Sequence, residues 1–539
     1  MNGSESAHRP KVLLWAGFFA IFAAGVGFSV RAGVLGDWAR AYGFTRSELG
    51  GITGGGLAGF GVIILLGSLL ADWIGYGRLM AFAFVMHIIS AGLQLAADPI
   101  YKSFGREGVY WSLYVAMFLF AIANGVCEAV VNPMVATIFP KEKTHYLNIL
   151  HAGWPGGLIA GGLLSYVMNG GAIGSWVPLG KVHWLIQMSM FLIPTLIYGV
   201  LCMGQKFPKS EAAESGLSIG TMLAQFASPI LLLLLFIHAL VGYVELGTDS
   251  WIGRITGTIM GDETRGLLLF VYTSGLMFIL RFFGGPIEHR LSPLGLLCLS
   301  GIMGAIGLTL LSRADTISMC VVAASVYALG KTFLWPTMLA VVSERFPKGG
   351  AITIGAMGGI GMLSAGFLGG PGIGFKQDYN ASKQLREAAP ATFERYAAEK
   401  ESTFLFFHEK GLDGSKVAAL DWATQANNSK ALPEQREEAE KELKNTLEQS
   451  KLAGWWEQAK DKREEDVKPL DASVLYGGRM ALQLTAAVPA IMAVLYLLLI
   501  VYFRMTGGYK RVEIAPSATP NDREAITTSP HGYRTPTAV

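Results

Sequence analysis

Residues 121–135, AIANGVCEAVVNPMV, place a carboxylate in the middle of an apolar stretch. The whole stretch, Val109–Val135, is long enough to cross a lipid bilayer as a helix. A carboxylate at membrane depth costs roughly 2.5 kcal/mol or more, so Glu128 is a hypothesis of a functional site. Asn124 and Asn132 lie four residues to either side of Glu128 and share its helix face. We therefore expect this face to look into protein or water, because lipid would leave its polar groups unsatisfied.

A second titratable side chain lies in the next apolar stretch. Residues 147–155 read LNILHAGWP, which brings His151 into the same region of the chain as Glu128. Polar side chains that only join packed helices also occur in membranes, and this alternative stays open for Glu128.

The composition is that of a polytopic membrane protein. Of the 539 residues, 52% are hydrophobic and 15% are charged, against about 25% charged in soluble proteins. Residues 376–470 carry 35 of the 83 charged side chains, which predicts a membrane body with one soluble insertion. The four cysteines all lie in apolar stretches and offer no disulfide framework or thiolate metal site. We expect no metal, no cofactor and no nucleic acid as a partner.

Twelve apolar stretches are long enough to span a bilayer. They are Val12–Leu35, Leu49–Ile74, Leu79–Ala97, Val109–Ile138, Leu147–Met168, Val182–Met203, Pro229–Ile252, Leu267–Phe283, Leu294–Leu311, Ser318–Val342, Ala351–Ile373 and Val474–Phe503. The expected fold is an all-α membrane protein of twelve transmembrane helices, six on each side of a polar joint. Basic residues gather in the loops on the side of both termini, which predicts that both termini are cytoplasmic.

The same pattern sets the expected domains. They are an N-terminal six-helix bundle at 1–204, a cytoplasmic linker at 205–228, helices 7–11 at 229–375, an extracytoplasmic helical insertion at 376–470, helix 12 at 471–506 and a disordered cytoplasmic tail at 507–539.

The insertion is expected to cap the outer mouth of the bundles. Its predicted helices are Ser382–Lys400, Ser415–Ala426 and Pro433–Glu465. Near the outer end of the seventh stretch, Glu245 and Asp249 are expected to be solvated, and an outer gate or a cation site is the alternative.

An internal repeat supports the division into two bundles. Glu128 lies five residues before Pro133, as Lys331 lies five before Pro336, and each stretch ends in Phe-Pro-Lys. Glu128 and Lys331 are therefore expected at matching depths in matching helices. Lys331 serves either the substrate or Glu128 as a counter-ion, and both roles are open.

Each half also carries an acid and an arginine after its second helix. Asp72 precedes Arg78 in the first half, and Glu288 precedes Arg290 in the second. Such a pair suits a gating salt bridge that is made in one conformation and broken in another, or it simply anchors the loop.

With these features the chain resembles the major facilitator superfamily, whose fold is two six-helix bundles related by a pseudo-two-fold axis. The loop after the second helix is similar to that superfamily's Gly-x-x-x-Asp-(Arg/Lys)-x-Gly-Arg motif. It departs from the motif at Ser68 and Trp73, and its arginine is displaced to Arg78.

Within the superfamily, two motifs resemble the fucose–galactose–glucose:proton symporter family. That family has Glu-x-x-x-Asn-Pro in its fourth helix and Leu-Asn-x-x-Gln in its fifth. This chain has Glu128, Asn132 and Pro133 at the first motif, and Asn148 and His151 at the second.

The resemblance implies a proton-coupled monosaccharide symporter that works by alternating access in the cytoplasmic (inner) membrane, and we expect a monomer. It implies that Glu128 carries the proton and that His151 tunes or shares it, because a low dielectric favours the neutral acid until water reaches it. The expected substrate-binding side chains are Arg31, Gln94, Asn124, Asn132, Asn148, Trp154, Tyr327, Lys331 and Trp335.

Two departures from that family keep the substrate open. Arg31 stands where the family has an Asp in helix one, and His151 replaces the Gln of helix five. An Arg in helix one with a Glu in helix four resembles the organic anion:cation symporters, so the alternative cargo is a sugar acid or other organic anion whose carboxylate binds Arg31. A sensor that keeps the transporter fold is a third hypothesis. An enzyme is the least expected, because the insertion offers a lone His408 and no nucleophile–base pair.

Overall fold

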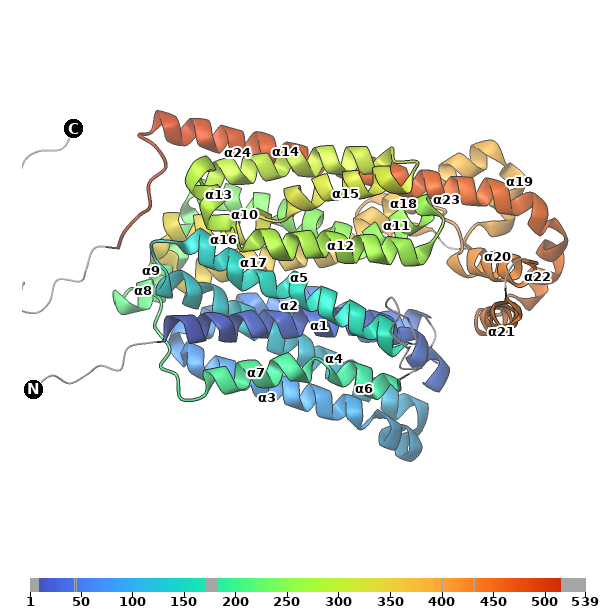
Figure 1. Ribbon diagram of the computed structural model, residues 1–539, viewed down its shortest axis with the longest axis horizontal. Coiled ribbons are helices and arrows are strands. Elements are labelled where there is room, and N and C mark those ends of the chain that lie inside the picture. The colour runs from blue at the N-terminus through green and yellow to red at the C-terminus, as the bar shows by residue number, and fades with distance from the viewer. Residues whose placement is uncertain are drawn as a thin grey trace, which may run out of the picture.

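The computed structural model describes residues 9–42, 44, 46–169, 182–399, 401–429 and 432–514. Two bundles of long helices lie side by side, and a group of short helices projects from one end of the second bundle (Figure 1). The first bundle contains α1 Pro10–Tyr42, α2 Arg46–Ile74, α3 Tyr76–Leu95, α4 Ala97–Ile138, α5 Lys143–Met168, α6 Trp184–Ser189 and α7 Leu192–Cys202.

A short linker joins the bundles through α8 Glu211–Glu214, α9 Ile219–Leu223 and η1 Ala224–Ala227. The second bundle contains α10 Pro229–Gly242, η2 Tyr243–Gly247, α11 Thr248–Met260, α12 Glu263–Arg281, α13 Gly284–Leu291, α14 Pro293–Ser312, α15 Ile317–Lys331, α16 Leu334–Arg345, η3 Pro347–Gly349, α17 Gly350–Ser364, η4 Ala365–Gly369, α18 Gly370–Ala388, α23 Arg463–Thr485 and α24 Ala487–Met505. Between α18 and α23 lie α19 Pro390–Tyr396, β1 Ser402–Phe404, β2 Phe407–Glu409, α20 Gly414–Ala426, α21 Pro433–Gln449, α22 Ala453–Ala459 and η5 Lys460–Lys462.

Ten helices among the described residues are long and apolar enough to cross a membrane. Two further predicted spans correspond to α2, whose apolar part is Gly59–Ile74, and to α5. The start of α1, the linker helices α8 and α9, and the end of α24 all lie at one end of the molecule, which we call the linker end (Figure 1). The opposite end, which carries α19–α22, is called the cap end. The last part of the predicted disordered tail, residues 515–539, lies outside the described residues.

The two bundles are in close contact where α2 meets α17. A Cβ atom added to Gly355 of α17 would lie 1.7 Å from the Ser68 Oγ of α2. Only glycine allows the two helix backbones to pack at this distance, as small residues do in membrane helix pairs. α5 of the first bundle also packs against α12, α13 and α16 of the second.

The insertion differs in detail from the predicted helices. The helix expected at Ser382–Lys400 is wrong in extent, because α18 continues out of the second bundle to Ala388 and the short α19 follows. Pro433–Glu465 is not one helix, since α21 ends at Gln449. A two-stranded antiparallel hairpin, β1–β2, was not predicted from the sequence. The expected helix at Ser415–Ala426 agrees with α20.

The insertion has a small core of its own. Leu385, Phe393, Tyr396 and Leu420 are buried together, and Trp455 packs against them. Trp455 donates its indole N–H to the Arg395 carbonyl oxygen at 3.0 Å. Trp455 therefore contributes to the packing of the insertion.

Candidate functional site

Glu128, Asn132 and His151 form a continuous hydrogen-bonded chain in the first bundle. The Asn132 amide donates to the Glu128 carboxylate at 2.6 Å, and its oxygen lies 2.8 Å from His151 Nε2. All three side chains are buried, with exposed fractions of 6% or less. The spacing of four residues aligns Glu128 and Asn132 on one face of α4, and α5 supplies His151.

Two prolines leave free carbonyl groups beside this chain. In an α-helix the carbonyl of residue i accepts from the N–H of residue i+4, and proline has no N–H. Pro155 therefore frees the carbonyl of His151, and Pro336 frees that of Thr332. A carbonyl without a partner is costly inside a membrane, so each one needs another donor.

Arg281 satisfies both carbonyls with a single guanidinium group. Its Nη1 donates to the His151 oxygen at 2.6 Å and its Nε to the Thr332 oxygen at 2.9 Å. Its third nitrogen, Nη2, donates to the Glu245 carboxylate at 2.9 Å. Because His151 belongs to the first bundle and Glu245 to the second, Arg281 joins the two halves of the molecule at one buried point.

The backbone around Arg281 is irregular in three helices. α12 ends at Arg281 and α13 begins at Gly284, while α15 ends at Lys331 and α16 begins at Leu334. Glu245 lies in the π-helical turn η2, and such turns frequently mark functional sites. Non-helical backbone at membrane depth is tolerated where it is buried in protein or lines a cavity, and broken helices form the binding sites of many transporters.

A second buried ion pair lies close to the first. Lys331 Nζ lies 2.5 Å from Asp249 Oδ1, and the Lys331 side chain has no exposed surface. The proposed pairing of Lys331 with Glu128 is therefore wrong for this state of the protein. The expectation that Glu245 and Asp249 are solvated is also wrong: the helical path from α10 continues to Met260, so both acids lie well inside it.

Tyr327 and Trp335 are buried among second-bundle residues. The Tyr327 hydroxyl donates to the Val244 carbonyl oxygen at 2.8 Å. The Trp335 ring lies 4.7 Å from that of His238, whose two nitrogens have no hydrogen-bond partner among the described residues. Asn148 of α5 reaches the second bundle at Thr337, 3.5 Å away.

Arg31 stands apart from these ion pairs. Its guanidinium carbon lies 4.4 Å from the centre of the Phe28 ring, and Phe28 in turn contacts Trp154 edge to face at 5.2 Å. Within the described part of the chain, Arg31 makes no hydrogen bond and no ion pair. A cation over an aromatic ring is stabilised by the ring's negative face, but its charge is not neutralised there.

Two predicted polar residues belong to separate clusters within the first bundle. The Asn124 oxygen lies 3.1 Å from His87 Nε2, and His87 Nδ1 lies 2.9 Å from the Tyr198 hydroxyl. Gln94 donates to the Ser90 hydroxyl at 3.0 Å. Among the described residues, no hydrogen bond joins either cluster to Glu128, although Asn124 lies on the same helix.

The predicted gating pairs have other partners at the linker end. Asp72 accepts a hydrogen bond from Ser210 of the linker at 2.9 Å, while Arg78 is exposed. Glu288 lies 3.8 Å from Arg511 near the end of the described chain. Arg290 is exposed as well.

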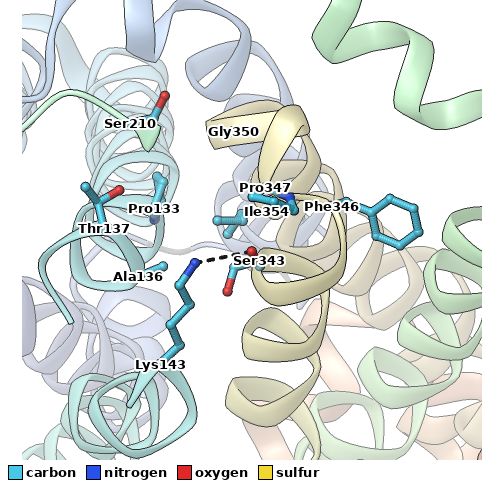
Figure 2. Close-up of a pocket in the computed structure, with 10 residues that line it drawn as sticks. All are labelled: Pro133, Ala136, Thr137, Lys143, Ser210, Ser343, Phe346, Pro347, Gly350 and Ile354. Atoms are coloured by element: carbon cyan, nitrogen blue, oxygen red, sulfur yellow. Dashed lines mark hydrogen bonds between the residues drawn. The ribbon is translucent and has the colours of Figure 1, made fainter. Parts of the chain in front are cut away.

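The linker end between the bundles is closed. Figure 2 shows the Lys143 side chain of α5 directed at Ser343 of α16, and its Nζ donates to the Ser343 carbonyl oxygen at 3.3 Å. The cavity beside this contact has a volume of about 20 Å³, room for roughly one water molecule. A substrate cannot pass here in this state.

Arg281 is a site residue that was not predicted from the sequence, although it lies shortly before Glu288 and Arg290 in the second half. The available signal was the pair of prolines: each one leaves a carbonyl unsatisfied, and a nearby arginine is the donor best suited to two of them. Among the described residues, no group of His, Cys, Asp and Glu side chains could hold a metal ion.

Comparison with known proteins identifies the fold. The family model described as Major Facilitator Superfamily matches residues 17–370. No curated protein matches the chain. Among solved structures, FucP in the outward conformation is similar with a TM-score of 0.54 and 17% identity, over 68% of this chain and 91% of that one. FucP is the fucose:proton symporter of E. coli.

Two other similar structures have the same TM-score. The proton:xylose symporter XylE, bound to 6-bromo-6-deoxy-D-glucose, has 13% identity over 67% of this chain and 87% of its own. A bacterial homologue of the human lysosomal transporter Spinster, inward-facing and unoccupied, has 13% identity over 92% and 98%. At these identities the structures establish a shared fold.

Proposed function

The chain belongs to the major facilitator superfamily, and we propose that it is a secondary active transporter that couples the movement of a monosaccharide to protons. One observation carries the proposal. The buried chain from Glu128 through Asn132 reaches the His151 ring, and the backbone carbonyl oxygen of His151 accepts a hydrogen bond from Arg281 at the interface that must open and close in alternating access.

Glu128 has the properties of a coupling acid. It is buried and hydrogen-bonded to an amide, and it has no ion-pair partner among the described residues. A carboxylate without a cation at membrane depth is favoured in its neutral form, and it ionises when water reaches it. Opening of the site to either side of the membrane therefore changes the proton affinity of Glu128, as coupling requires.

The surrounding side chains suit a hydroxyl-rich ligand. Asn132 and Asn148 offer amides, and His151 offers a ring nitrogen, close to the bundle interface. Trp154 and Trp335 supply aromatic faces for a sugar ring. Two of the similar structures, FucP and XylE, are sugar:proton symporters by name, which supports the same substrate class here.

The proposal includes a membrane topology. The ten apolar helices, together with α2 and α5, would make twelve spans in the cytoplasmic membrane, arranged as two bundles at 1–204 and 229–375 plus 471–506. The linker end would face the cytoplasm and the insertion the outside. In that orientation the structure is closed toward the cytoplasm. The functional unit is proposed to be a monomer.

A sugar acid or other organic anion is the second candidate substrate. Arg281 and Lys331 are already neutralised by Glu245 and Asp249, whereas Arg31 has no ion pair among the described residues. An uncompensated guanidinium favours a ligand with a carboxylate, which it can bind through two parallel hydrogen bonds.

Reconstitution into proteoliposomes tests both candidates. With an imposed pH gradient, the wild-type protein is expected to accumulate one member of a panel of labelled monosaccharides and sugar acids. Glu128→Gln is expected to lose gradient-driven accumulation while it retains exchange of the same substrate between the two sides, because the carrier can still reorient. Glu263→Gln, an exposed acid at the start of α12, is the matched control and is expected to behave as wild type.

Three outcomes decide between the hypotheses. Full accumulation by the Glu128→Gln variant would refute proton coupling through Glu128. If Arg31→Gln lost the binding of sugar acids but not of neutral sugars, the substrate would be an organic anion. Substrate binding with no transport in any condition would identify a sensor.

A further inference from the structure

The chain turns back on itself after the last long helix. α24 ends at Met505, and Gly507 and Gly508 have φ angles of 95° and 91°, in the region that favours glycine. The Gly508 N–H donates to the Phe503 carbonyl oxygen at 2.7 Å, which closes the turn. The described residues 507–514 then run across the linker end, and we call them the C-terminal strap.

Glu344 of α16 anchors the strap at several atoms. Tyr509 donates its hydroxyl to Glu344 Oε2 at 2.8 Å, and the Val512 N–H donates to the Glu344 carbonyl oxygen at 2.9 Å. Arg511 Nε lies 2.9 Å from Glu344 Oε1, and Arg511 Nη2 lies 3.8 Å from Glu288. On the same helix, Arg345 donates to the Lys510 carbonyl oxygen at 2.5 Å.

Arg511 also reaches the other bundle. Its Nη1 donates to the carbonyl oxygen of Lys141, in the loop between α4 and α5. One side chain of the strap therefore contacts α13 and α16 of the second bundle and a loop of the first. The neighbouring contacts between bundles are Lys143 with the Ser343 carbonyl, and the Gly285 N–H with His145 Nδ1 at 3.3 Å (Figure 2 shows the first).

The two acids under the strap need this cation. The side chains of Glu344 and Glu288 are 0% and 8% exposed, so neither is well solvated. Burial and the neighbouring charge of Glu344 raise the pKa of Glu288, whereas the positive charge of Arg511 lowers this pKa. Arg511 itself remains 40% exposed, so it can leave the acids for water at a modest cost.

We propose that the C-terminal strap is a latch on the linker-end gate, with Arg511 as one of the residues that hold the two bundles together when this gate is closed. The inference rests on the proposed transport function for its meaning, because a latch matters only if the gate opens. When α5 moves away from α16, the Lys141 carbonyl leaves Arg511, while the contacts within the second bundle can persist. The strap therefore biases the protein toward the state that is closed at the linker end.

Hydrogen exchange of the full-length protein in nanodiscs, without substrate, tests the latch. Arg511→Gln is expected to raise exchange at residues 139–148 and 343–352 by about tenfold, the loss expected for charge-assisted hydrogen bonds across a gate. Lys510→Gln removes the same charge from the adjacent, exposed residue and is expected to leave exchange unchanged. Arg511→Lys, which keeps the charge but not the fork of donors, is expected to fall between them.

Each contrary result has a definite meaning. Unchanged exchange in Arg511→Gln, or an equal rise in Lys510→Gln, would overturn the latch. A rise in Arg511→Gln that extends equally to α1 and α10 would also overturn it, because this pattern reports general destabilisation. The readout needs no substrate, so a failure of sugar transport would leave a positive result for the latch intact and would count against the proposed function alone.

Discussion

His151 and Arg281 meet across the interface of the two bundles: the guanidinium Nη1 lies 2.6 Å from the His151 carbonyl oxygen. The contact exists because Pro155 leaves that carbonyl without its helical donor. It links the backbone of the helix that carries His151 to the ion pair of Arg281 with Glu245. A change at the protonatable chain of the first bundle is thereby connected to the second bundle by one hydrogen bond.

We expect the loss of one charge of the Arg281–Glu245 ion pair to destabilise the fold more than the loss of both charges. Glu245→Gln leaves a buried guanidinium without its counter-charge, and loss of one partner of a buried pair costs about 3–5 kcal/mol. Arg281→Gln combined with Glu245→Gln removes both charges and keeps an amide donor near the His151 and Thr332 carbonyl oxygens, so it is expected to recover part of the stability, although not transport. Thermal unfolding of the purified variants measures this. Equal destabilisation in the single and the double variant would contradict it.

Pro155→Ala is expected to weaken the contact between the bundles. An alanine at this position supplies the N–H that the His151 carbonyl lacks, so the helical bond competes with Arg281. The difference between a charge-assisted and an ordinary hydrogen bond, about 1 kcal/mol, would shift the closed population several-fold. Distances between spin labels at the exposed residues Glu142 and Lys348 report the width of the linker end.

Pro336→Ala is the matched control for this shift. It restores the donor for the Thr332 carbonyl, but Thr332 and Arg281 belong to the same bundle. Its label distances should stay close to those of the wild type. If both proline variants opened the linker end equally, the effect would come from helix stiffness rather than from the contact of Arg281 with His151.

Gly355→Ala is expected to push α2 and α17 apart. The added Cβ would lie 1.7 Å from Ser68 Oγ, and overpacking of this kind costs about 1–3 kcal/mol. Ser68→Gly removes the obstructing side chain, so the double variant should recover most of the loss. The same pair of spin labels measures separation at the linker end. No rescue by Ser68→Gly would show that the helices do not approach here as described.

Much of the fold could be predicted from the sequence because a membrane span is determined by consecutive residues. About 20 apolar residues make a span, and ten helices meet that condition among the described residues. The relation of Glu128 to Asn132 is also local, since a spacing of four fixes a shared helix face. Proximity of His151 to that face was expected, and the structure shows it as a hydrogen bond to Asn132.

The pairings between distant helices could not be predicted in this way. The Glu245 side chain was expected to be solvated because the apolar stretch ends soon after it. In the structure the helical path continues to Met260, so Glu245 lies inside the bundle. The repeat suggested Glu128 as one of two possible partners of Lys331, but Lys331 pairs with Asp249 instead. Which cation meets which acid depends on helix packing and rotation, and a single sequence contains no direct record of these. Arg78 and Arg290 are exposed in this conformation, so their gating role stays a prediction for the other state of the protein.

The two ion pairs of the second bundle have an electrical consequence. Each pair is neutral overall, so the membrane voltage exerts little net force on them as that half moves. A full elementary charge that crosses 100 mV exchanges about 2.3 kcal/mol with the field. In the first bundle, Arg31 and Glu128 would cancel while the acid is ionised, and one positive charge would remain once it takes up a proton. The membrane voltage would then exert a force on the protein with Glu128 protonated and little net force on the protein with Glu128 ionised.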